Sequence, residues 1–215
     1  MMLKKELLKR PGLYLVTDNE ILKGKDLLGI LSASLKAGLD MVQLRDKESS
    51  DTDFLELGRK IKALLKEKQA LFIINDRIDI AFALDADGVH LGPEDTSIES
   101  ARKILGKEKI IGYSASSLRE AKMAAKKDVD YIAIGAIFPT PVKPDYKLAG
   151  LETFKKAVKE IDTPVVAIGG INETNIEDVV RTGVKRIAVV RAILNSPTPY
   201  LATKKLLGKL LQSHR

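Results

Sequence analysis

Residues 41–74, MVQLRDKESSDTDFLELGRKIKALLKEKQALFII, contain the pattern that decides the predicted fold. Two short apolar runs, MVQL at 41–44 and LFII at 71–74, enclose the segment FLELGRKIKALLKE, whose apolar residues recur at helical spacing. A continuous apolar run is typical of a strand in a parallel sheet, where both faces are buried. The stretch therefore predicts a strand, a helix that covers the sheet, and a second strand parallel to the first.

The same alternation runs along the whole chain. Apolar runs bounded by Gly, Asp or Asn recur eight times, at 13–16, 41–44, 71–74, 88–91, 109–113, 131–135, 164–168 and 186–190. Helical segments such as LLGILSASLKAG and IEDVVRTG lie between them, so we predict a closed (β/α)₈ TIM barrel that residues 1–215 form as one domain. An open doubly wound sheet has a similar rhythm, but its nucleotide-binding form carries G-x-G-x-x-G after the first strand, where this chain has TDNEILKG.

The composition indicates a soluble protein of the cytoplasm. The chain is 45% hydrophobic and 30% charged and has no cysteine, which excludes disulfides, thiolate zinc sites and a cysteine nucleophile. The first residues lack the apolar core and cleavage pattern of a signal peptide. Because no apolar run approaches the roughly 18 residues of a membrane-spanning helix, we expect no membrane partner.

The formal net charge of +7 raises the question of an anionic partner. Most lysines lie in helical stretches such as KALLKEK and AKMAAKKD, so we expect solvated helix faces. Few aromatic residues accompany them, which argues against a nucleic-acid partner. The oligomeric state stays open, with a homo-oligomer among the alternatives.

Polar residues follow the predicted strands at the end where barrels carry their active sites. The period of two along QLRDK places Gln43, Arg45 and Lys47 on one face, which suits an anion clamp. Alternatively, Arg45 simply pairs with Asp46, and Lys47 is a solvated loop charge.

Two carboxylates follow the next two strands. Asp76 and Asp95 lie after adjacent strands, so they could face each other and hold Mg²⁺ together with a di- or triphosphate. Alternatively, Asp76 caps a helix that begins at Arg77, and Asp95 caps the helix after TSIES. His90 falls on the same strand end without having to be a ligand. With only two histidines in the chain, a multi-histidine metal site is excluded.

The last strands suggest a phosphate site. Gly169 and Gly170 precede a helix expected to open at about Asn172, so backbone amides could approach an anion closely. A tight turn is the alternative for this pair. Arg191 ends the eighth strand, beside the same pocket or in a surface ion pair.

The assembled motifs resemble thiamine-phosphate synthase through nearly the whole chain. The matching pieces are YLVTD at 14–18, QLRDK at 43–47, INDRIDIAFALDADGVHLGPED at 74–95, IGYSA at 111–115, YIAIGAIFPTPVK at 131–143, VVAIGGI at 165–171 and RIAVVRAI at 186–193. The resemblance implies a barrel enzyme that joins hydroxymethylpyrimidine diphosphate to a thiazole phosphate, or to its carboxylated form, and releases pyrophosphate.

The resemblance also implies a role for each matching residue. Gln43, Arg45, Lys47 and Asn75 would hold the pyrimidine diphosphate, Asp76 and Asp95 would bind Mg²⁺, and Ser114 would contact the pyrimidine or its leaving group. Lys143 would contact the diphosphate, and Thr140, Gly170, Val190 and Arg191 would form the thiazole-phosphate site. Arg45, Ser114 and Lys143 are the expected catalytic residues. The prolines of IGAIFPTPVKPDYK, at 134–147, would hold Lys143 over the leaving group.

Three positions depart from the family pattern. Val142 replaces a second hydroxyl, Arg191 replaces a serine, and Ser116 replaces a frequent histidine. Val142 and Arg191 motivate one alternative, a non-catalytic barrel that binds phosphate ligands. A second alternative is a thiazole tautomerase-like enzyme, a related barrel of similar sequence. Because the tautomerase would rely on the histidine that Ser116 replaces, the synthase is the favoured interpretation.

Overall fold

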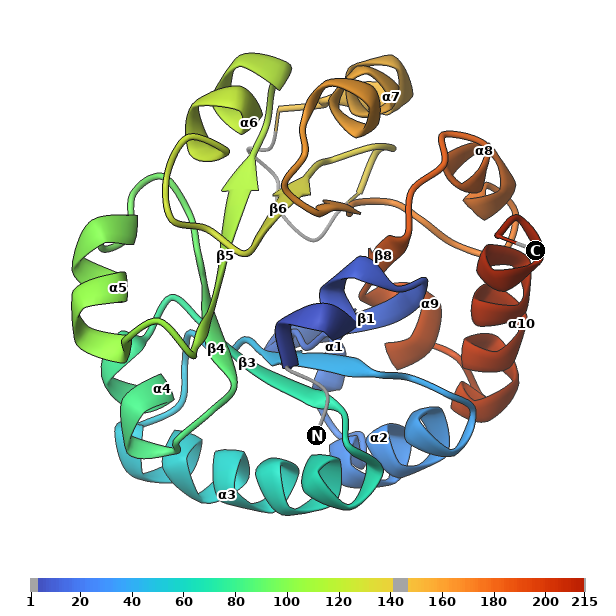
Figure 1. Cartoon of the computed structure of the whole chain (residues 1–215). Coiled ribbons are helices and arrows are strands. Elements are labelled where there is room, and N and C mark those ends of the chain that lie inside the picture. The colour runs from blue at the N-terminus through green and yellow to red at the C-terminus, as the bar shows by residue number, and fades with distance from the viewer. Residues whose placement is uncertain (1–3, 141–146, 215) are drawn as a thin grey trace.

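A computed structural model, which describes residues 4–140 and 147–214, forms a closed barrel of eight parallel strands (Figure 1). The strands are β1 Gly12–Val16, β2 Met41–Leu44, β3 Leu71–Asn75, β4 Gly88–Leu91, β5 Ile110–Ala115, β6 Tyr131–Ile134, β7 Val165–Ala167 and β8 Arg186–Val189. Each strand pairs with the next in sequence, and β8 pairs with β1 to close the barrel. The predicted (β/α)₈ barrel is confirmed, and the eight predicted runs overlap the observed strands.

The α-helices form a ring around the barrel, and the 3₁₀ helix η1 lies across one end of it (Figure 1). They are η1 Lys4–Lys9, α1 Asn19–Leu22, α2 Leu27–Lys36, α3 Asp51–Lys68, α4 Ile78–Ala83, α5 Ile98–Leu105, α6 Leu118–Ala124, α7 Gly150–Glu160, α8 Ile176–Val180, α9 Arg191–Leu194 and α10 Pro199–Gln212. Side-chain caps start several of them: Asp26 accepts a hydrogen bond from the Gly29 amide, and Ser50 accepts one from the Asp53 amide. Helices α2 and α3 therefore each begin directly after a polar capping residue.

Alternation along the strands produces two separate apolar layers. Tyr14 and Val16 of β1 face the barrel interior, while Leu13 and Leu15 face the helices. The same split divides the later strands, so both faces of the sheet are buried and the runs contain few polar residues. The polar side chains that do face the interior are therefore exceptions that need hydrogen-bond partners.

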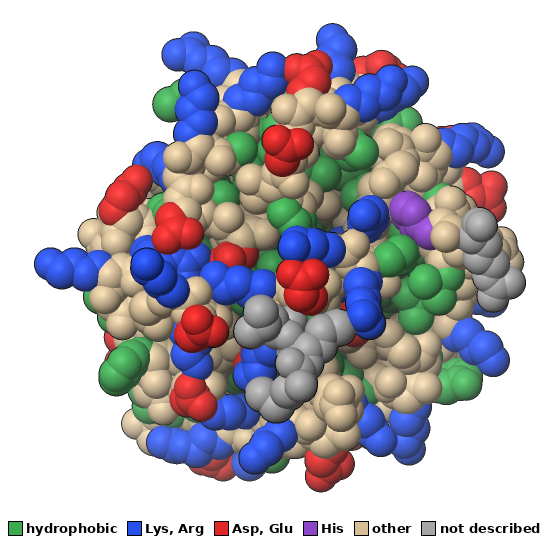
Figure 2. All heavy atoms as spheres, viewed as in Figure 1, with side chains coloured by type: hydrophobic (Ala, Val, Ile, Leu, Met, Phe, Trp, Pro, Cys, Tyr) green, Lys and Arg blue, Asp and Glu red, His purple; other side chains and the backbone are tan. Residues whose placement is uncertain are grey.

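The end of the barrel opposite the carboxyl ends of the strands is closed by η1, which crosses the front of the view in Figure 1. Beneath it, the buried Arg186 donates to both carboxylate oxygens of Asp40, at 2.7 and 2.9 Å, and to the carbonyl oxygen of Leu7 at 2.7 Å. Gly12 leaves room for this pair, because a Cβ there would lie 2.4 Å from Oδ2 of Asp40. Figure 2 shows acidic and basic side chains interspersed over this face, which fits the expected solvated charges.

The predicted start of the helix after β7, at the carboxyl ends of the strands, is wrong. The helix after the seventh strand begins at Ile176 and not at about Asn172. Asn172 is used in the turn instead: its backbone amide donates to Oδ1 of Asn175, and its own Oδ1 accepts from the Thr174 amide. None of the helices within residues 4–140 and 147–214 combines the length and apolar character needed to cross a bilayer.

Candidate active site

Arg45 is held at the carboxyl end of the barrel by Asp18. Its Nη1 donates to Oδ2 of Asp18 at 2.7 Å, and its backbone amide donates to Oγ1 of Thr17 at 2.8 Å. Both partners follow β1, next to β2 in the sheet, and both are buried. The guanidinium has five N–H donors, so the single bond to Asp18 fixes its place without using its capacity for an anion.

The alternative pairing of Arg45 with Asp46 is wrong. The Asp46 carboxylate accepts instead from the backbone amides of Glu48 and Ser49, both at 2.9 Å. It also accepts from the side-chain amide of Asn19. Asp46 therefore shapes the loop that carries Lys47.

Gln43 points into the barrel, as the predicted alternation requires. It is 3% exposed, and its Nε2 donates to the Tyr14 hydroxyl, while the neighbouring Leu44 faces the helices. Lys47 is exposed and lies beyond the strand, with its Nζ 3.9 Å from Oδ2 of Asp76. The three predicted clamp residues thus follow one another from the interior to the rim.

Asp76 does not cap the helix that follows it. The N-cap of α4 is Arg77, whose side chain makes no capping hydrogen bond. Asp76 has a φ of 60°, in a left-handed region that Asp tolerates better than most residues, and its amide donates to the carbonyl oxygen of His90 at 2.9 Å. Asn75 ends β3 opposite His90. This backbone presents the Asp76 carboxylate at the rim beside Lys47.

Asp95 does not cap its helix either, because Ser97 caps α5 by accepting from the Ser100 amide at 3.2 Å. One carboxylate oxygen of Asp95 accepts from the Gly92 amide at 2.6 Å. Asp76 and Asp95 follow the paired strands β3 and β4, so the fold brings their loops to adjacent positions.

Asp76 and Asp95 are carboxylates that follow the adjacent strands β3 and β4 at this rim. Among residues 4–140 and 147–214, no three His, Asp or Glu side chains gather closely enough to hold a metal ion. Two carboxylates without a full cage suit Mg²⁺, which takes one or two from the protein and completes its shell with waters and substrate phosphates. The residues present therefore fit a metal that arrives with a diphosphate.

Ser114 lies on β5, half-buried, with its Oγ 2.8 Å from Nε2 of His90. The Nδ1 of His90 lies 2.9 Å from the Tyr131 hydroxyl, so the imidazole faces the barrel interior through both nitrogens. Tyr14 and Tyr131 were not predicted as part of the site. The sequence signal for a polar network inside the barrel is that the apolar runs LYLV, GVHL and YIAIG each contain one polar side chain, Tyr14, His90 and Tyr131 respectively.

Gly169 and Gly170 hold the ends of β6 and β7 together. Their φ values are 99° and 69°, and a Cβ on Gly170 would lie 2.6 Å from the carbonyl oxygen of Pro139. The Phe138 amide donates to the Gly169 carbonyl oxygen at 3.1 Å, and Nδ2 of Asn175 donates to the Gly170 carbonyl oxygen at 2.9 Å. The pair forms a tight turn packed on the loop after β6.

The remaining predicted residues lie at the same rim or outside the described residues. Val190 is the N-cap of α9 and Arg191 its exposed first residue, with no ion pair recorded for Arg191 within the described ranges. Thr140 is half-buried and is the last residue described before the gap. Val142 and Lys143 lie outside the described residues.

Ser116 is engaged at the start of α6. Its backbone amide and hydroxyl donate to Oε2 of Glu120 at 2.8 and 2.9 Å, and these bonds lower the pKa of Glu120. The hydroxyl is therefore satisfied by the helix start next to the pocket.

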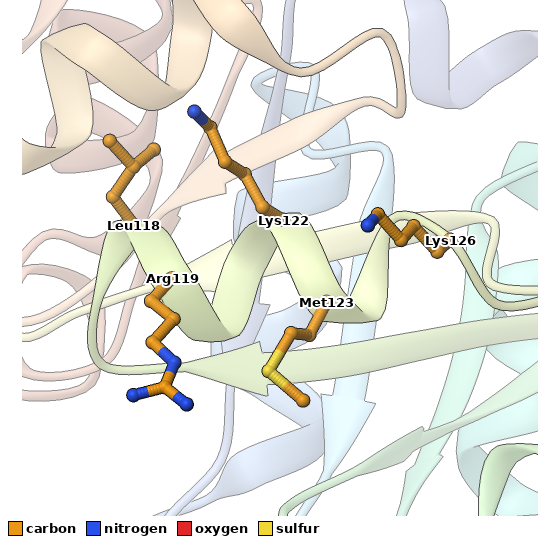
Figure 3. A pocket seen from close by; sticks show the side chains of 5 residues that line it. All are labelled: Leu118, Arg119, Lys122, Met123 and Lys126. Carbon is orange, nitrogen blue, oxygen red and sulfur yellow. The ribbon is translucent and has the colours of Figure 1, made fainter.

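Two hollows lie away from the strand ends. One of about 360 Å³ lies on the outer surface of α6, where Leu118 and Lys122 point to one side of the helix and Arg119 and Met123 to the other (Figure 3). The second, of about 620 Å³, lies beside η1 at the closed end of the barrel. Because neither is lined by residues of the carboxyl rim, the site is defined by the side chains gathered there.

Comparison with known proteins decides the family. The family model described as thiamine monophosphate synthase matches residues 13–193. The chain belongs to this family. A thiamine-phosphate synthase from Clostridium tetani is 41% identical over 196 residues, which cover 91% of this chain and 94% of that protein. One from Methanobrevibacter smithii is 43% identical over 196 residues, covering 91% and 93%.

A solved structure carries the same family likeness. The thiamine phosphate pyrophosphorylase from Pyrococcus furiosus superposes with a TM-score of 0.89 at 39% identity, covering 96% of this chain and 98% of that one. Membership in the thiamine monophosphate synthase family thus agrees with the sequence motifs and with the fold.

Proposed function

We propose that the chain condenses 4-amino-2-methyl-5-hydroxymethylpyrimidine diphosphate with 4-methyl-5-(2-phosphoethyl)thiazole to thiamine phosphate and releases pyrophosphate. With the carboxylated form of the thiazole, the same condensation also releases CO₂. Family membership supports the reaction. The observation that carries the mechanism is the Asp18–Arg45 pair, which places a fixed guanidinium on the rim that Lys47 and Asp76 share.

The reaction needs charge stabilisation more than a protein nucleophile. The carbon–oxygen bond of the pyrimidine methylene breaks, and its electron pair leaves with the diphosphate. The thiazole nitrogen donates its lone pair to the methylene carbon and forms the new carbon–nitrogen bond. Negative charge grows on the departing diphosphate, where Arg45 and Lys47 are positioned to stabilise it. Lys143 is assigned to the same task from its match to the family motif.

Asp76 and Asp95 would hold Mg²⁺, which would neutralise part of the diphosphate charge when bound. The left-handed backbone of Asp76 and the Gly92 amide bond to Asp95 support this assignment, since neither carboxylate is used as a helix cap. Gln43, Asn75 and Ser114 would contact the pyrimidine diphosphate from the barrel interior. These residues lie on β2, β3 and β5, and together with β4 these strands form one continuous part of the sheet.

The thiazole phosphate would bind on the other side of the rim. Thr140, Gly170, Val190 and Arg191 are assigned to it by their motif positions. Gly170 supports the assignment, because its turn brings the loop after β6 against the end of β7. Arg191 at the start of α9 would supply a cation where the family pattern has a serine.

The test is product formation by the purified full chain with both substrates and Mg²⁺. We expect thiamine phosphate and pyrophosphate in equal amounts, and loss of both with EDTA that excess Mg²⁺ reverses. Arg45→Gln should lower kcat/KM on the order of 10²- to 10³-fold. Arg59→Gln, an exposed arginine of α3, is the matched control and should behave as wild type.

Folded protein that binds the diphosphate but yields no product would contradict the proposal. That outcome would favour the non-catalytic barrel. Isomerisation of the thiazole without the diphosphate would favour a tautomerase-like enzyme instead.

A further inference from the structure

A series of side-chain hydrogen bonds crosses the barrel interior and joins two residues of the proposed site. It begins at Gln43, whose Nε2 donates to the Tyr14 hydroxyl. The hydroxyls of Tyr14 and Tyr131 lie 2.9 Å apart, and the Tyr131 hydroxyl lies 2.9 Å from Nδ1 of His90. The series ends where Nε2 of His90 meets Oγ of Ser114, at 2.8 Å. We call these five residues the interior relay.

Packing fixes the middle of the interior relay. Tyr14 and Tyr131 are 1% and 0% exposed, and their rings meet edge to face with centroids 6.0 Å apart. The His90 ring stacks on Tyr131 at 5.5 Å. Gly112 gives the Tyr131 ring its place, since a Cβ there would lie 2.0 Å from Cζ. Burial raises the pKa of both tyrosines well above the ordinary value, so each keeps its single hydroxyl hydrogen at neutral pH.

The amide at one end gives the relay a direction. An amide nitrogen only donates, so the Tyr14 oxygen accepts from Gln43. Tyr14 is buried, and donating to the Tyr131 oxygen is what gives its own hydrogen a partner within the relay. The Tyr131 hydrogen then goes to Nδ1 of His90. A neutral imidazole that accepts at Nδ1 carries its proton on Nε2, and that proton goes to the Ser114 oxygen. The hydroxyl hydrogen of Ser114 is left to point outside the relay.

We propose that Tyr14, Tyr131 and His90 are positioning residues that hold His90 in its Nε2–H tautomer and present the Ser114 hydroxyl as a hydrogen-bond donor to the substrate. The identity of that substrate, the pyrimidine diphosphate, rests on the proposed function. Its ring nitrogens and its diphosphate oxygens are acceptors, which a donating serine recognises. If the Gln43 side chain instead placed its amide oxygen against Tyr14, each hydrogen bond of the relay would run in the opposite direction. The Ser114 hydroxyl would then donate to Nε2 of His90 and could only accept a hydrogen bond from the substrate.

The tautomer is measurable directly by ¹⁵N NMR of the imidazole rings in the full chain. The sequence contains only two histidines, so a His214→Gln variant assigns the spectrum. His214 lies at the far end of the chain, against the carbonyl oxygen of Val184, and the substitution should leave activity unchanged. We expect the proton of His90 on Nε2 and an unprotonated Nδ1. A wild-type protein with the proton on Nδ1 would overturn the proposal.

Kinetics test the link from the relay to Ser114. Tyr131→Phe removes the donor to Nδ1 and should lower kcat/KM by about tenfold, the effect of one ordinary hydrogen bond. Tyr14→Phe leaves that donor in place and should cost less. In the double variant Tyr131→Phe/Ser114→Ala, the tyrosine change should add nothing to the loss caused by Ser114→Ala alone.

Fully additive losses would overturn the positioning role, because they would mean that Tyr131 acts independently of Ser114. A wild-type protein without synthase activity would fail the proposed function only, since the NMR measurement would still decide the tautomer.

Discussion

The Arg45 guanidinium donates to the Asp18 carboxylate at 2.7 Å, across the gap between two neighbouring strand ends. The side chains are only 18% and 10% exposed, so water competes weakly for this pair. Asp18 also accepts from the Ile21 amide at 3.3 Å, which anchors it to the start of α1. Asp18, which directly follows β1, therefore fixes the orientation in which the Arg45 guanidinium can bind an anion.

Asp18→Asn should lower kcat/KM and raise KM for the pyrimidine diphosphate, because Arg45 loses its charged anchor. We expect a loss on the order of 10- to 100-fold, typical of a displaced catalytic group. Glu56→Gln is the matched control, since Glu56 is an exposed acid of α3 that pairs only with the surface residue Lys60 among the ion pairs of the described residues. Steady-state kinetics of both variants give the comparison, and equal effects would show that Asp18 has no special hold on Arg45.

Asp76→Asn and Asp95→Asn should each raise the Mg²⁺ concentration needed for half-maximal activity. The increase should reach at least the roughly 10- to 100-fold that loss of an outer-shell partner costs in metal affinity. Asp79→Asn changes an exposed acid of α4 that pairs with Arg77, and it should leave the Mg²⁺ requirement unchanged. Activity measured across a Mg²⁺ titration checks this. An unchanged requirement in both site variants would remove the metal assignment.

Gly170→Ala should destabilise the turn at the end of β7 more than Gly183→Ala does. Both glycines have left-handed φ values, 69° and 85°, so both substitutions introduce backbone strain of about 1–2 kcal/mol. Only Gly170 lacks space, with the Pro139 and Phe138 carbonyl oxygens 2.6 and 2.7 Å from the added Cβ, whereas nothing lies within 4 Å at Gly183. Urea unfolding and KM for the thiazole phosphate should both respond at Gly170. Equal unfolding losses would contradict the packing argument.

Asp40→Ala should lower the free energy of unfolding by about 3 kcal/mol, because it leaves the charged Arg186 buried without its carboxylate. Asp178→Ala removes an exposed pair with Arg181 and should cost between about 0 and 1 kcal/mol. Denaturant melts of the two variants measure the difference. Similar midpoints would mean that water satisfies Arg186 when Asp40 is gone.

The strands and the rim were predictable, since both follow from patterns local in sequence. Continuous apolar runs fix the strands, and residues just after them must lie at one end of a parallel barrel. Side-chain pairings were not predictable: Arg45 selects Asp18, 27 positions away, over the adjacent Asp46. Ser97, two positions after Asp95, is the residue that caps α5. Tyr14 and Tyr131 meet 117 positions apart, which no local pattern encodes.

The contacts of Arg186 have a consequence for the order in which the molecule is assembled during synthesis. Its partners Leu7 and Asp40 precede it by 179 and 146 positions, so at about 5 to 20 residues per second Leu7 is made roughly 10 to 40 s before Arg186. Until β8 emerges, β1 and β7 remain open sheet edges, which invite pairing with other chains. A ribosome-bound chain that lacks β8 therefore depends on protection from aggregation, and barrel closure is a late event of its biogenesis.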